Sequence, residues 1–194
     1  ARTNGAKILI SQEEQDKDII TLSDNDYSLI YSHLCSSFYN KKPKNIIAVT
    51  GTNGKTSVAD FCRQLWSFYG LKSASIGTLG IIKSSQKYYA NIRSKLTTLD
   101  SSELNRQLSK LNDQQISYVA LEASSHGIDQ NRLDGINFNG AIFTNLSHDH
   151  LDYHKDMKHY FSAKKKLFIE QLKDGACVSI NLDDQYGMEV PSII

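Results

Sequence analysis

The amino-acid sequence predicts an α/β fold built on a parallel sheet, and three observations carry that prediction. Short apolar runs without polar alternation, such as 46–50 and 118–121, are typical of strands buried on both faces. Stretches with one apolar face at helical spacing separate these runs. A glycine-rich loop that ends in Gly54-Lys55-Thr56 joins one run to the next helix. The 194 residues suffice for one sizeable domain but not for a three-domain enzyme.

The first part of the chain predicts two short apolar strands, over 6–10 and 19–22, and then a helix. Ser23 or Asp24 can cap this helix, which is expected to end near Asn40. A buried strand over 46–50, a helix that stops near Gly70 and a strand over 73–76 follow. The apolar positions of the two helices are Tyr27, Ile30, Leu34 and Phe38 in the first, and Val58, Phe61, Cys62, Leu65 and Phe68 in the second.

The second part continues the alternation. Residues 81–96 are polar and ambiguous, with a hairpin as one interpretation. Asp100 and Glu103 form a capping box before a helix that carries Leu104, Leu108 and Leu111. Strands are expected over 118–121, 141–143 and 176–180, and a helix over 157–172. Strands that alternate with helices indicate a parallel sheet with right-handed crossovers.

The composition excludes several classes of protein. With 22 Lys and Arg against 21 Asp and Glu, the net charge of +1 gives no electrostatic case for a nucleic-acid partner. The 2 prolines exclude a proline-rich linker. No apolar run approaches the roughly 20 residues that insertion across a membrane needs. The three cysteines lie in apolar surroundings and are expected to be reduced, buried thiols, which fits a cytoplasmic protein. The oligomeric state cannot be read from the sequence.

The segment from Gly51 to Ser57 reads Gly51-Thr52-Asn53-Gly54-Lys55-Thr56-Ser57 and is expected to bind nucleotide phosphates. A glycine-rich turn lets backbone N–H groups close on phosphate oxygens, and the following helix N-terminus adds positive potential. Lys55 would reach the outer phosphates, and the Thr56 hydroxyl would bind Mg²⁺. The spacing is two residues shorter than the common phosphate loop. The alternative is a tight strand-to-helix turn with no ligand.

Glu122 stands at the end of the predicted strand 118–121, where the sites of parallel α/β sheets lie. A carboxylate there can hold the Mg²⁺ of a nucleotide bound by a neighbouring strand's loop. The alternative is a surface glutamate in a salt bridge.

Three histidines and two aspartates fall within 148–154, after the predicted strand 141–143. In an extended segment, 148, 150, 152 and 154 would share one face, which suggests metal binding. No second Cys/His cluster completes a zinc site. Beside a phosphate loop, Mg²⁺ with mostly oxygen ligands is better chemistry. For His148 and His154, the alternative is a solvated polar loop.

Lys164 falls inside the apolar stripe of the helix 157–172, whereas Lys165 and Lys166 fall outside it. An unpaired buried ammonium is costly, so its pKa is expected to fall toward the neutral amine. A neutral amine can react with CO₂ to give a carbamate, which is a carboxylate able to bind Mg²⁺ or orient a cation. The alternative is a lysine that snorkels to the surface.

Several long motifs, in this order, resemble the Mur ligases, most closely their UDP-N-acetylmuramoyl-tripeptide synthetases. The resemblance covers roughly 44–186. The motifs are Gly51-Thr52-Asn53-Gly54-Lys55-Thr56, Leu96-Thr97-Thr98, Glu122-Ala123-Ser124-Ser125-His126-Gly127-Ile128-Asp129-Gln130-Asn131-Arg132, Thr144-Asn145-Leu146-Ser147-His148-Asp149-His150-Leu151-Asp152-Tyr153-His154 and Ala163-Lys164.

The resemblance implies a P-loop-like central ATPase domain and an ATP-dependent ligation. ATP would phosphorylate the D-glutamate carboxylate of UDP-N-acetylmuramoyl-L-alanyl-D-glutamate, and the amine of meso-diaminopimelate or L-lysine would attack the acyl phosphate. By resemblance, Thr56 and Glu122 hold one Mg²⁺, His150 helps to hold a second, and Lys164 is carbamylated. The resemblance also implies a set of residues that contact the muramoyl dipeptide: Thr97, Thr98, Ser124, Gln130 and Arg132.

Two residues depart from the family pattern: Leu99 stands where proline is usual, and His148 where arginine is usual. By resemblance, residues 1–22 are a remnant of the N-terminal UDP-binding domain and 23–194 the central ATP-binding domain. The C-terminal amino-acid-binding domain is expected to be absent, so this chain alone is not expected to complete ligation. A folylpolyglutamate-synthase-like ligase and a non-catalytic nucleotide-binding fragment are the alternatives.

Overall fold

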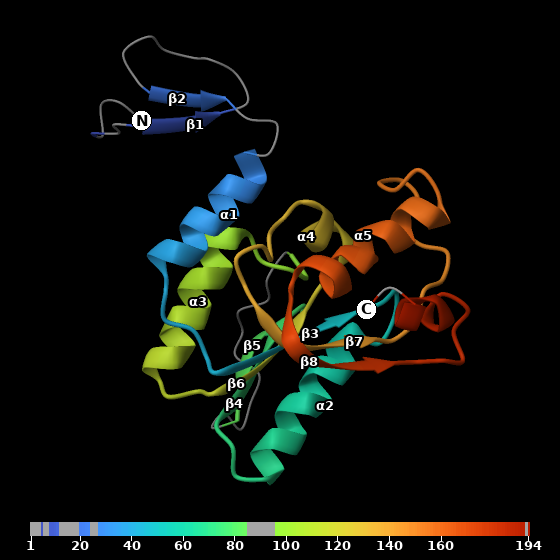
Figure 1. The fold of residues 1–194 in the computed structure, drawn as a ribbon. Helices are drawn as coiled ribbons and strands as arrows, with labels where there is room; N and C mark the ends of the chain where they lie inside the picture. The colour runs from blue at the N-terminus through green and yellow to red at the C-terminus, as the bar shows by residue number, and fades with distance from the viewer. Residues whose placement is uncertain (1–4, 6–7, 12–19, 24–26, 85–95, 193) are drawn as a thin grey trace.

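A six-stranded sheet forms the centre of the protein in the computed structural model, which describes residues 5, 8–11, 20–23, 27–84, 96–192 and 194 (Figure 1). The strand order is β5-β4-β6-β3-β7-β8, and neighbouring strands are parallel except for the antiparallel pair β4–β5. The strands are β3 (Asn45–Thr50), β4 (Ser73–Gly77), β5 (Gly80–Lys83), β6 (Tyr118–Glu122), β7 (Phe138–Phe143) and β8 (Leu172–Ile180).

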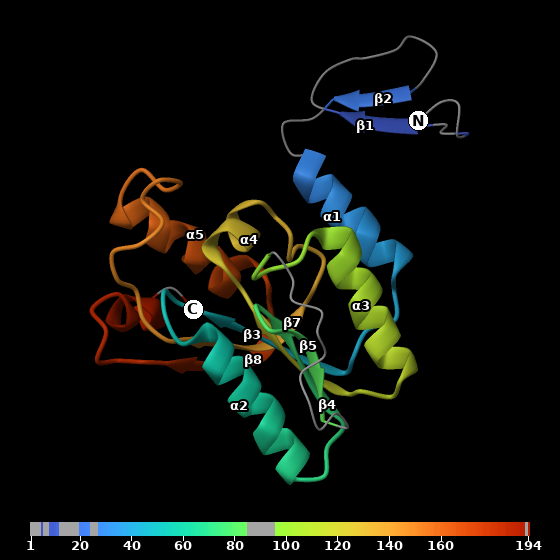
Figure 2. The same cartoon turned by 180° about the vertical axis from the view of Figure 1, so that it is seen from behind.

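Helices cover the two faces of this sheet unequally (Figures 1 and 2). Side chains of α3, α4 and α5 pack into the larger core on one face, and α2 forms a smaller core on the other. The helix α1 packs against α3. The helices are α1 (Tyr27–Phe38), α2 (Lys55–Phe68), α3 (Ser101–Asp113), α4 (Ser125–Asp129) and α5 (Met157–Glu170), with a 3₁₀ helix η2 (Gly187–Ser192).

The strands β1 (Ile8–Ser11) and β2 (Ile20–Ser23) form a separate parallel pair. The domain boundary expected after residue 22 stays a prediction, and that position lies within β2. Part of the ambiguous segment 81–96 is resolved, because β5 forms a hairpin with β4, whereas 85–95 lie outside the described residues. Among the described helices, none combines the length and apolarity needed to cross a membrane.

The predicted parallel α/β fold is confirmed, but the buried faces of two helices differ from the apolar stripes. In α2, Val58 and Cys62 of the predicted stripe pack against the smaller core beside the buried Ala59. Phe61 and Phe68 of the same stripe are instead 58% and 86% exposed. In α1, Phe38 is 78% exposed. The buried residues of α1 are instead Ser32, Cys35 and Ser36. Small side chains bring these helices close to their neighbours, which leaves the large ones outside.

Two smaller expectations need correction. Asp100 caps α3 by accepting from the Ser102 and Glu103 amides, but the Glu103 carboxylate pairs with Arg106 and Gln107 instead of completing a capping box. The cysteines are free, yet only Cys35 is buried, while Cys62 is half-buried and Cys177 is exposed on β8.

Candidate functional site

Four neighbouring strands, β4, β6, β3 and β7, direct their carboxyl ends to one edge of the sheet, and the candidate site lies there (Figure 1). The loop from Gly51 follows β3 and ends where α2 begins at Lys55. Gly54 stands at the N-cap with φ 84°, and no side chain in the described part of the chain caps this terminus. The first amides of α2 are therefore available to an anion.

Residues after β7 hold the phosphate loop in place. Asn145 accepts from the Thr52 amide through its carbonyl at 2.8 Å, and from the Asn53 amide through its side-chain oxygen at 2.9 Å. The Thr144 hydroxyl donates to the Asn53 carbonyl at 2.7 Å. Gly51, with φ 145°, lies so close that a Cβ atom would stand 1.9 Å from the Thr144 hydroxyl. This position therefore requires glycine.

Lys55 is folded back over the loop. Its Nζ atom donates to the carbonyl oxygens of Gly51 at 2.9 Å and Thr52 at 2.8 Å. Burial lowers the pKa of Lys55, while the Glu122 and Asp149 carboxylates oppose that shift. The ammonium thus lies at the phosphate loop, with carbonyl partners that an incoming phosphate can replace. Ser57 is exposed on the first turn of α2.

Glu122, the last residue of β6, is 2% exposed, which excludes the surface salt bridge considered from the sequence. Its carboxylate accepts from the Thr56 hydroxyl at 2.8 Å, and from the amide and hydroxyl of Thr78 at 2.9 and 3.2 Å. Gly77 makes room for it, because a Cβ atom there would stand 2.0 Å from Glu122 Oε1. A hydroxyl and a carboxylate thus meet beside the phosphate loop, as Mg²⁺ would need.

Lys164 is 1% exposed on α5, so it does not snorkel to the surface. Its Nζ atom donates to the Gly51 carbonyl at 2.8 Å and lies 4.7 Å from the centre of the Tyr160 ring. Burial lowers the pKa of Lys164 well below its usual value, and the nearby Lys55 ammonium lowers it further. This direction agrees with the shift toward the neutral amine that the sequence predicts.

The histidine segment is a turn, so the expected extended face of 148, 150, 152 and 154 is wrong. His150 has φ 52°, and the His154 amide donates to its carbonyl at 2.9 Å, as in a helical turn. His150 is half-buried and His148 is exposed. His154 is buried and stacks on Tyr160 with ring centres 5.0 Å apart. The turn thus places His148 in solvent, His150 at the edge of the site and His154 against Tyr160.

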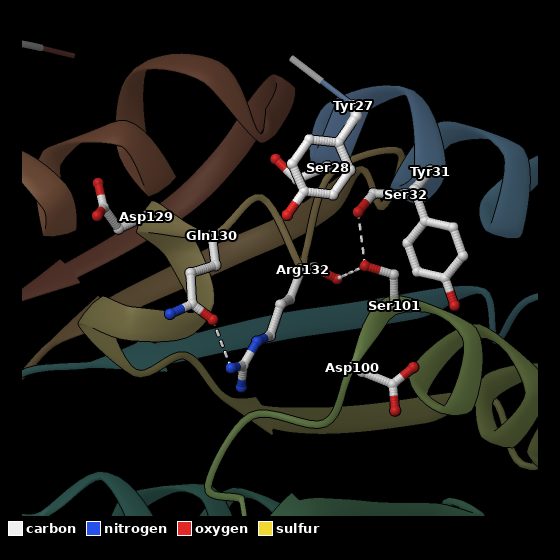
Figure 3. A pocket seen from close by; sticks show the side chains of 9 residues that line it. All are labelled: Tyr27, Ser28, Tyr31, Ser32, Asp100, Ser101, Asp129, Gln130 and Arg132. Atoms are coloured by element: carbon white, nitrogen blue, oxygen red, sulfur yellow. Dashed lines mark hydrogen bonds between the residues drawn. The ribbon is translucent and has the colours of Figure 1, made fainter. Parts of the chain in front are cut away.

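Hydrogen bonds connect the expected substrate residues to Glu122. The buried Thr98 hydroxyl donates to the Glu122 carbonyl at 2.9 Å and lies 2.9 Å from the Ser124 hydroxyl. Arg132 donates to the Thr98 carbonyl at 2.9 Å and to the Gln130 side chain (Figure 3). Thr97 is half-buried and accepts from Thr78 at 3.3 Å. Because Thr98 is fully buried, we expect it to position its neighbours, whereas the half-buried Arg132 has more N–H groups than these two bonds use.

Sequence reasoning assigned no role to several residues that the structure brings into the site. Thr144 and Asn145 support the phosphate loop, and Thr78 donates to Glu122. The Tyr160 ring lies beside the Lys164 ammonium, and the Tyr160 hydroxyl forms a hydrogen bond of 3.2 Å with the Thr52 hydroxyl. Thr144 and Asn145 directly follow a buried strand next to β3, and this strand-end placement was the available signal. Within the described residues, no group of three His, Cys, Asp or Glu side chains is arranged to hold a metal.

The sheet, the phosphate loop and the strand-end carboxylate define a nucleotide-binding α/β domain of the P-loop type. The chain belongs to the Mur ligase family: the sequence model of the Mur ligase middle domain matches residues 49–193.

Individual relatives point to one branch of this family. The chain is 49% identical over 160 residues to the UDP-N-acetylmuramoyl-L-alanyl-D-glutamate–2,6-diaminopimelate ligase of Anaplasma marginale (strain St. Maries), a match that covers 81% of this chain and 34% of the relative. The enzyme of the same name from Agrobacterium fabrum is 42% identical, with 96% and 37% covered. The chain thus spans about a third of the length of these relatives.

Among solved structures, a ligase of the same name as these relatives is more similar to this chain than a folylpolyglutamate synthase is. A structure of a UDP-N-acetylmuramoyl-L-alanyl-D-glutamate–2,6-diaminopimelate ligase superposes with a TM-score of 0.80 and 33% identity, over 98% of this chain and 38% of the other. Folylpolyglutamate synthase of Mycobacterium tuberculosis, complexed with ADP and AMPPCP, superposes with a TM-score of 0.61 and 17% identity, over 84% and 43%. The second likeness shows the fold alone.

Proposed function

We propose that this chain carries the ATP-binding part of a ligase that joins a diamino acid to UDP-N-acetylmuramoyl-L-alanyl-D-glutamate in peptidoglycan precursor synthesis. The contact between the Thr56 hydroxyl and the buried Glu122 carboxylate, beside a phosphate loop, carries the proposal. The names of the relatives favour 2,6-diaminopimelate over L-lysine as the diamino acid. Because the reaction consumes ATP, we propose the cytoplasm as its compartment.

The phosphate loop would bind and orient ATP. The amides of Gly54 to Ser57 would donate to the phosphate oxygens at the start of α2, and Lys55 would leave the Gly51 and Thr52 carbonyls to pair with the outer phosphates. Positioning of the γ-phosphate in line with the D-glutamate carboxylate is the main contribution that such a site can make. The D-glutamate oxygen then bonds to phosphorus as the bond to ADP breaks.

The donor set of the site fits Mg²⁺. The described hydrogen bonds to the buried Glu122 carboxylate come from two hydroxyls and one amide, which leaves its negative charge for a cation. Thr56 and Glu122 would hold one ion, and His150 would help to hold a second. When bound, Mg²⁺ neutralises the negative charge of the transferring phosphoryl group.

A carbamate on Lys164 is the finer part of the proposal. The lone pair of the neutral Nζ atom adds to the carbon of CO₂, a C–N bond forms, one C=O electron pair moves to oxygen, and the ammonium proton leaves to solvent. The product is a carboxylate in place of an amine, next to Lys55. Burial of Lys164 and its contact with the phosphate loop support this step.

The muramoyl dipeptide would bind along Thr97, Ser124, Gln130 and Arg132, with Thr98 holding the group together. Arg132 suits a carboxylate because its planar fork binds such groups in a bidentate manner. The attacking amine of the diamino acid forms the amide bond as phosphate leaves. A folylpolyglutamate-synthase-like activity is disfavoured because that likeness is one of fold alone at 17% identity.

Calorimetric titration of MgATP into the folded chain tests the proposal. We expect saturable binding that weakens at least about tenfold in Lys55→Ala, because a charge-assisted contact to phosphate is lost. Lys41→Ala is the matched control, since this lysine side chain is 68% exposed and remote from the loop in the fold. A folded wild-type chain that binds no MgATP would contradict the proposal.

A further inference from the structure

The turn at His150 brings the side chain of Tyr153 to the end of α4. The Tyr153 amide donates to the His150 carbonyl at 3.1 Å, and its hydroxyl donates to Asp129, the last residue of α4, at 3.0 Å. The ring centre of Tyr153 lies 4.1 Å from that of His126 and 4.8 Å from that of His154. Because two rings pack against it, the Tyr153 ring has a defined place although the residue is 41% exposed.

A row of hydrogen bonds runs from Asp129 through Tyr153 and Gln130 to Arg132. The Tyr153 hydroxyl donates to Asp129 Oδ2 and accepts from the amide nitrogen of Gln130 at 3.4 Å. The oxygen of the same amide accepts from the Arg132 guanidinium (Figure 3). Arg132 also donates to the Thr98 carbonyl at 2.9 Å. A tyrosine of the histidine turn therefore contacts the first of two neighbours, Gln130 and Arg132, that are expected to bind the acceptor.

The charge of Asp129 sets the direction of these hydrogen bonds. A carboxylate only accepts, so the single hydroxyl proton of Tyr153 points to Asp129. The tyrosine oxygen then accepts from its other neighbour, and the NH₂ group of Gln130 must face it. The amide oxygen of Gln130 is left toward Arg132, whose guanidinium has donors alone. The opposite orientation of the amide would set the N–H groups of Gln130 against those of Arg132.

Tyr153 acts on this pair from outside the cavity that the pair lines. Gln130 and Arg132 form part of the wall of a cavity of about 420 Å³ (Figure 3). Tyr153 is not part of that wall in the described residues. Asp129 also has a second partner, because Lys166 of α5 lies 3.2 Å from its Oδ1 atom. The carboxylate is thus oriented from two sides, and its effect on Arg132 passes through Tyr153 and Gln130.

We propose that Tyr153 is a positioning residue that connects the two halves of the site. It fixes the Gln130 amide, and through it the Arg132 guanidinium, relative to the turn that carries His150. The inference rests on the proposed function, in which Gln130 and Arg132 contact the acceptor and His150 helps to hold Mg²⁺. Arg132 then presents its remaining N–H groups in a fixed plane, as a bidentate contact with an anion requires. Tyr153 does not touch the reacting atoms.

The side-chain NH₂ group of Gln130 reports this orientation by NMR without any ligand. Its ¹H–¹⁵N signals are assigned by their loss in Gln130→Glu. Tyr153→Phe keeps the ring against His126 and removes only the hydroxyl, so the signals should shift toward those of a solvent-exposed glutamine. Tyr69→Phe is the matched control, because it removes the hydroxyl of a tyrosine that is 75% exposed after α2. It should leave the Gln130 signals in place.

Asp129→Asn tests the direction of the hydrogen bonds. An asparagine amide can donate to the Tyr153 oxygen, which frees the hydroxyl proton for the Gln130 oxygen and turns the NH₂ group toward Arg132. The Gln130 signals should therefore shift in Asp129→Asn as well. The double variant should match Tyr153→Phe alone, because the effect of Asp129 passes through the tyrosine hydroxyl.

Calorimetry measures the consequence for binding. UDP-N-acetylmuramoyl-L-alanyl-D-glutamate is titrated into the chain with Mg²⁺ and the non-hydrolysable ATP analogue AMPPCP, so that no phosphoryl group is transferred. Tyr153→Phe should weaken acceptor binding by about two- to tenfold and leave MgAMPPCP binding unchanged. Unchanged Gln130 signals in Tyr153→Phe would refute the positioning role alone, and so would an unchanged acceptor affinity. A folded wild-type chain that does not bind MgAMPPCP would instead contradict the proposed function.

Discussion

Lys55 and Lys164 donate to the same oxygen atom, the carbonyl of Gly51, at 2.9 and 2.8 Å. One lysine begins α2 and the other lies in the middle of α5, so the contact joins the helices on opposite faces of the sheet at the phosphate loop. Two ammonium groups on one carbonyl repel each other, and Lys164, the more buried of the two, is the one whose pKa falls well below its usual range. Its neutral form relieves that repulsion.

The first prediction concerns this amine. With ¹³C-labelled bicarbonate, the wild-type chain should show a carbamate carbon signal by NMR, and Lys164→Met should lack it. Methionine fills similar volume without a buried amine, so its unfolding free energy should stay within about 1.5 kcal/mol of the wild type. Lys165→Met, on the same helix but less buried, is the control and should keep the signal. A signal that persists in Lys164→Met would assign the carbamate elsewhere.

A second prediction tests Glu122 as a metal ligand. Glu122→Gln keeps the shape of the side chain and an acceptor for Thr56 and Thr78 but removes the charge. We expect MgATP affinity to fall at least about tenfold, while ATP without Mg²⁺ binds as well as before, since only the carboxylate–cation attraction is lost. Calorimetry with and without Mg²⁺ measures both.

Gly77→Ala should also weaken MgATP binding although the carboxylate is kept, because the added Cβ would stand 2.0 Å from Glu122 Oε1 and displace it. Gly70→Ala is a useful comparison, since a Cβ atom there meets no atom within 4 Å, although φ is 75°. Loss of ATP binding in Glu122→Gln to the same extent with and without Mg²⁺ would argue against a metal role.

The sites that depend on short sequence motifs could be predicted from the sequence. The loop at Gly51, the strand-end Glu122 and the stripe that carries Lys164 all follow from residue order and spacing, and their burial agrees with it. Contacts between segments that are distant in the sequence could not be predicted. The support of Asn53 by Thr144 and Asn145 depends on β7 lying beside β3, which no local pattern specifies.

The side of a helix that packs on the sheet could also not be predicted fully from the sequence. A hydrophobic stripe predicts which side of a helix is apolar, but not whether that side meets the sheet. In α2 the fully buried contact with β3 and β6 is made by the small Ala59, while Val58 and Cys62 of the stripe pack there only in part. The prediction of an extended histidine segment was wrong for another reason. A left-handed φ of 52° at His150 turns the chain, and a histidine in the sequence gives no strong local indication of such a turn.

A third prediction concerns Asn145 as a positioning residue. Its three hydrogen bonds to Thr52 and Asn53 fix the loop before ATP arrives, and two of these use the side chain. Asn145→Ala should therefore weaken MgATP binding by about tenfold at a cost of about 1–2 kcal/mol in stability. Asn145→Asp keeps the acceptor for the Asn53 amide and should lose less stability than alanine does.

Asn139→Ala offers a control for the general cost of losing an asparagine, because its side chain accepts from the Ile46 amide at the other end of the sheet. It should lower stability and leave ATP affinity unchanged. Equal ATP affinities for Asn145→Ala and the wild type would show that the loop is rigid without this support.

The last prediction concerns acid sensitivity. Burial lowers the pKa of His154, and burial together with His150 lowers the pKa of His126, whose ring centre lies 5.7 Å from that of His154. In the unfolded chain both groups have a pKa of about 6.5. Between that value and the lower folded pKa values, the unfolded chain binds more protons. Stability is therefore full above about pH 6.5 and is lost as the pH falls through the folded pKa values.

Thermal unfolding from pH 8 down to pH 5 measures this loss. His154→Phe should flatten the decline, because it keeps the stack on Tyr160 and removes a buried Nε2 atom that has no hydrogen-bond partner among the described residues. His148→Gln, at an exposed position of the same turn, should decline as steeply as the wild type. If His154→Phe declines equally steeply, the acid sensitivity belongs to groups other than the buried histidine.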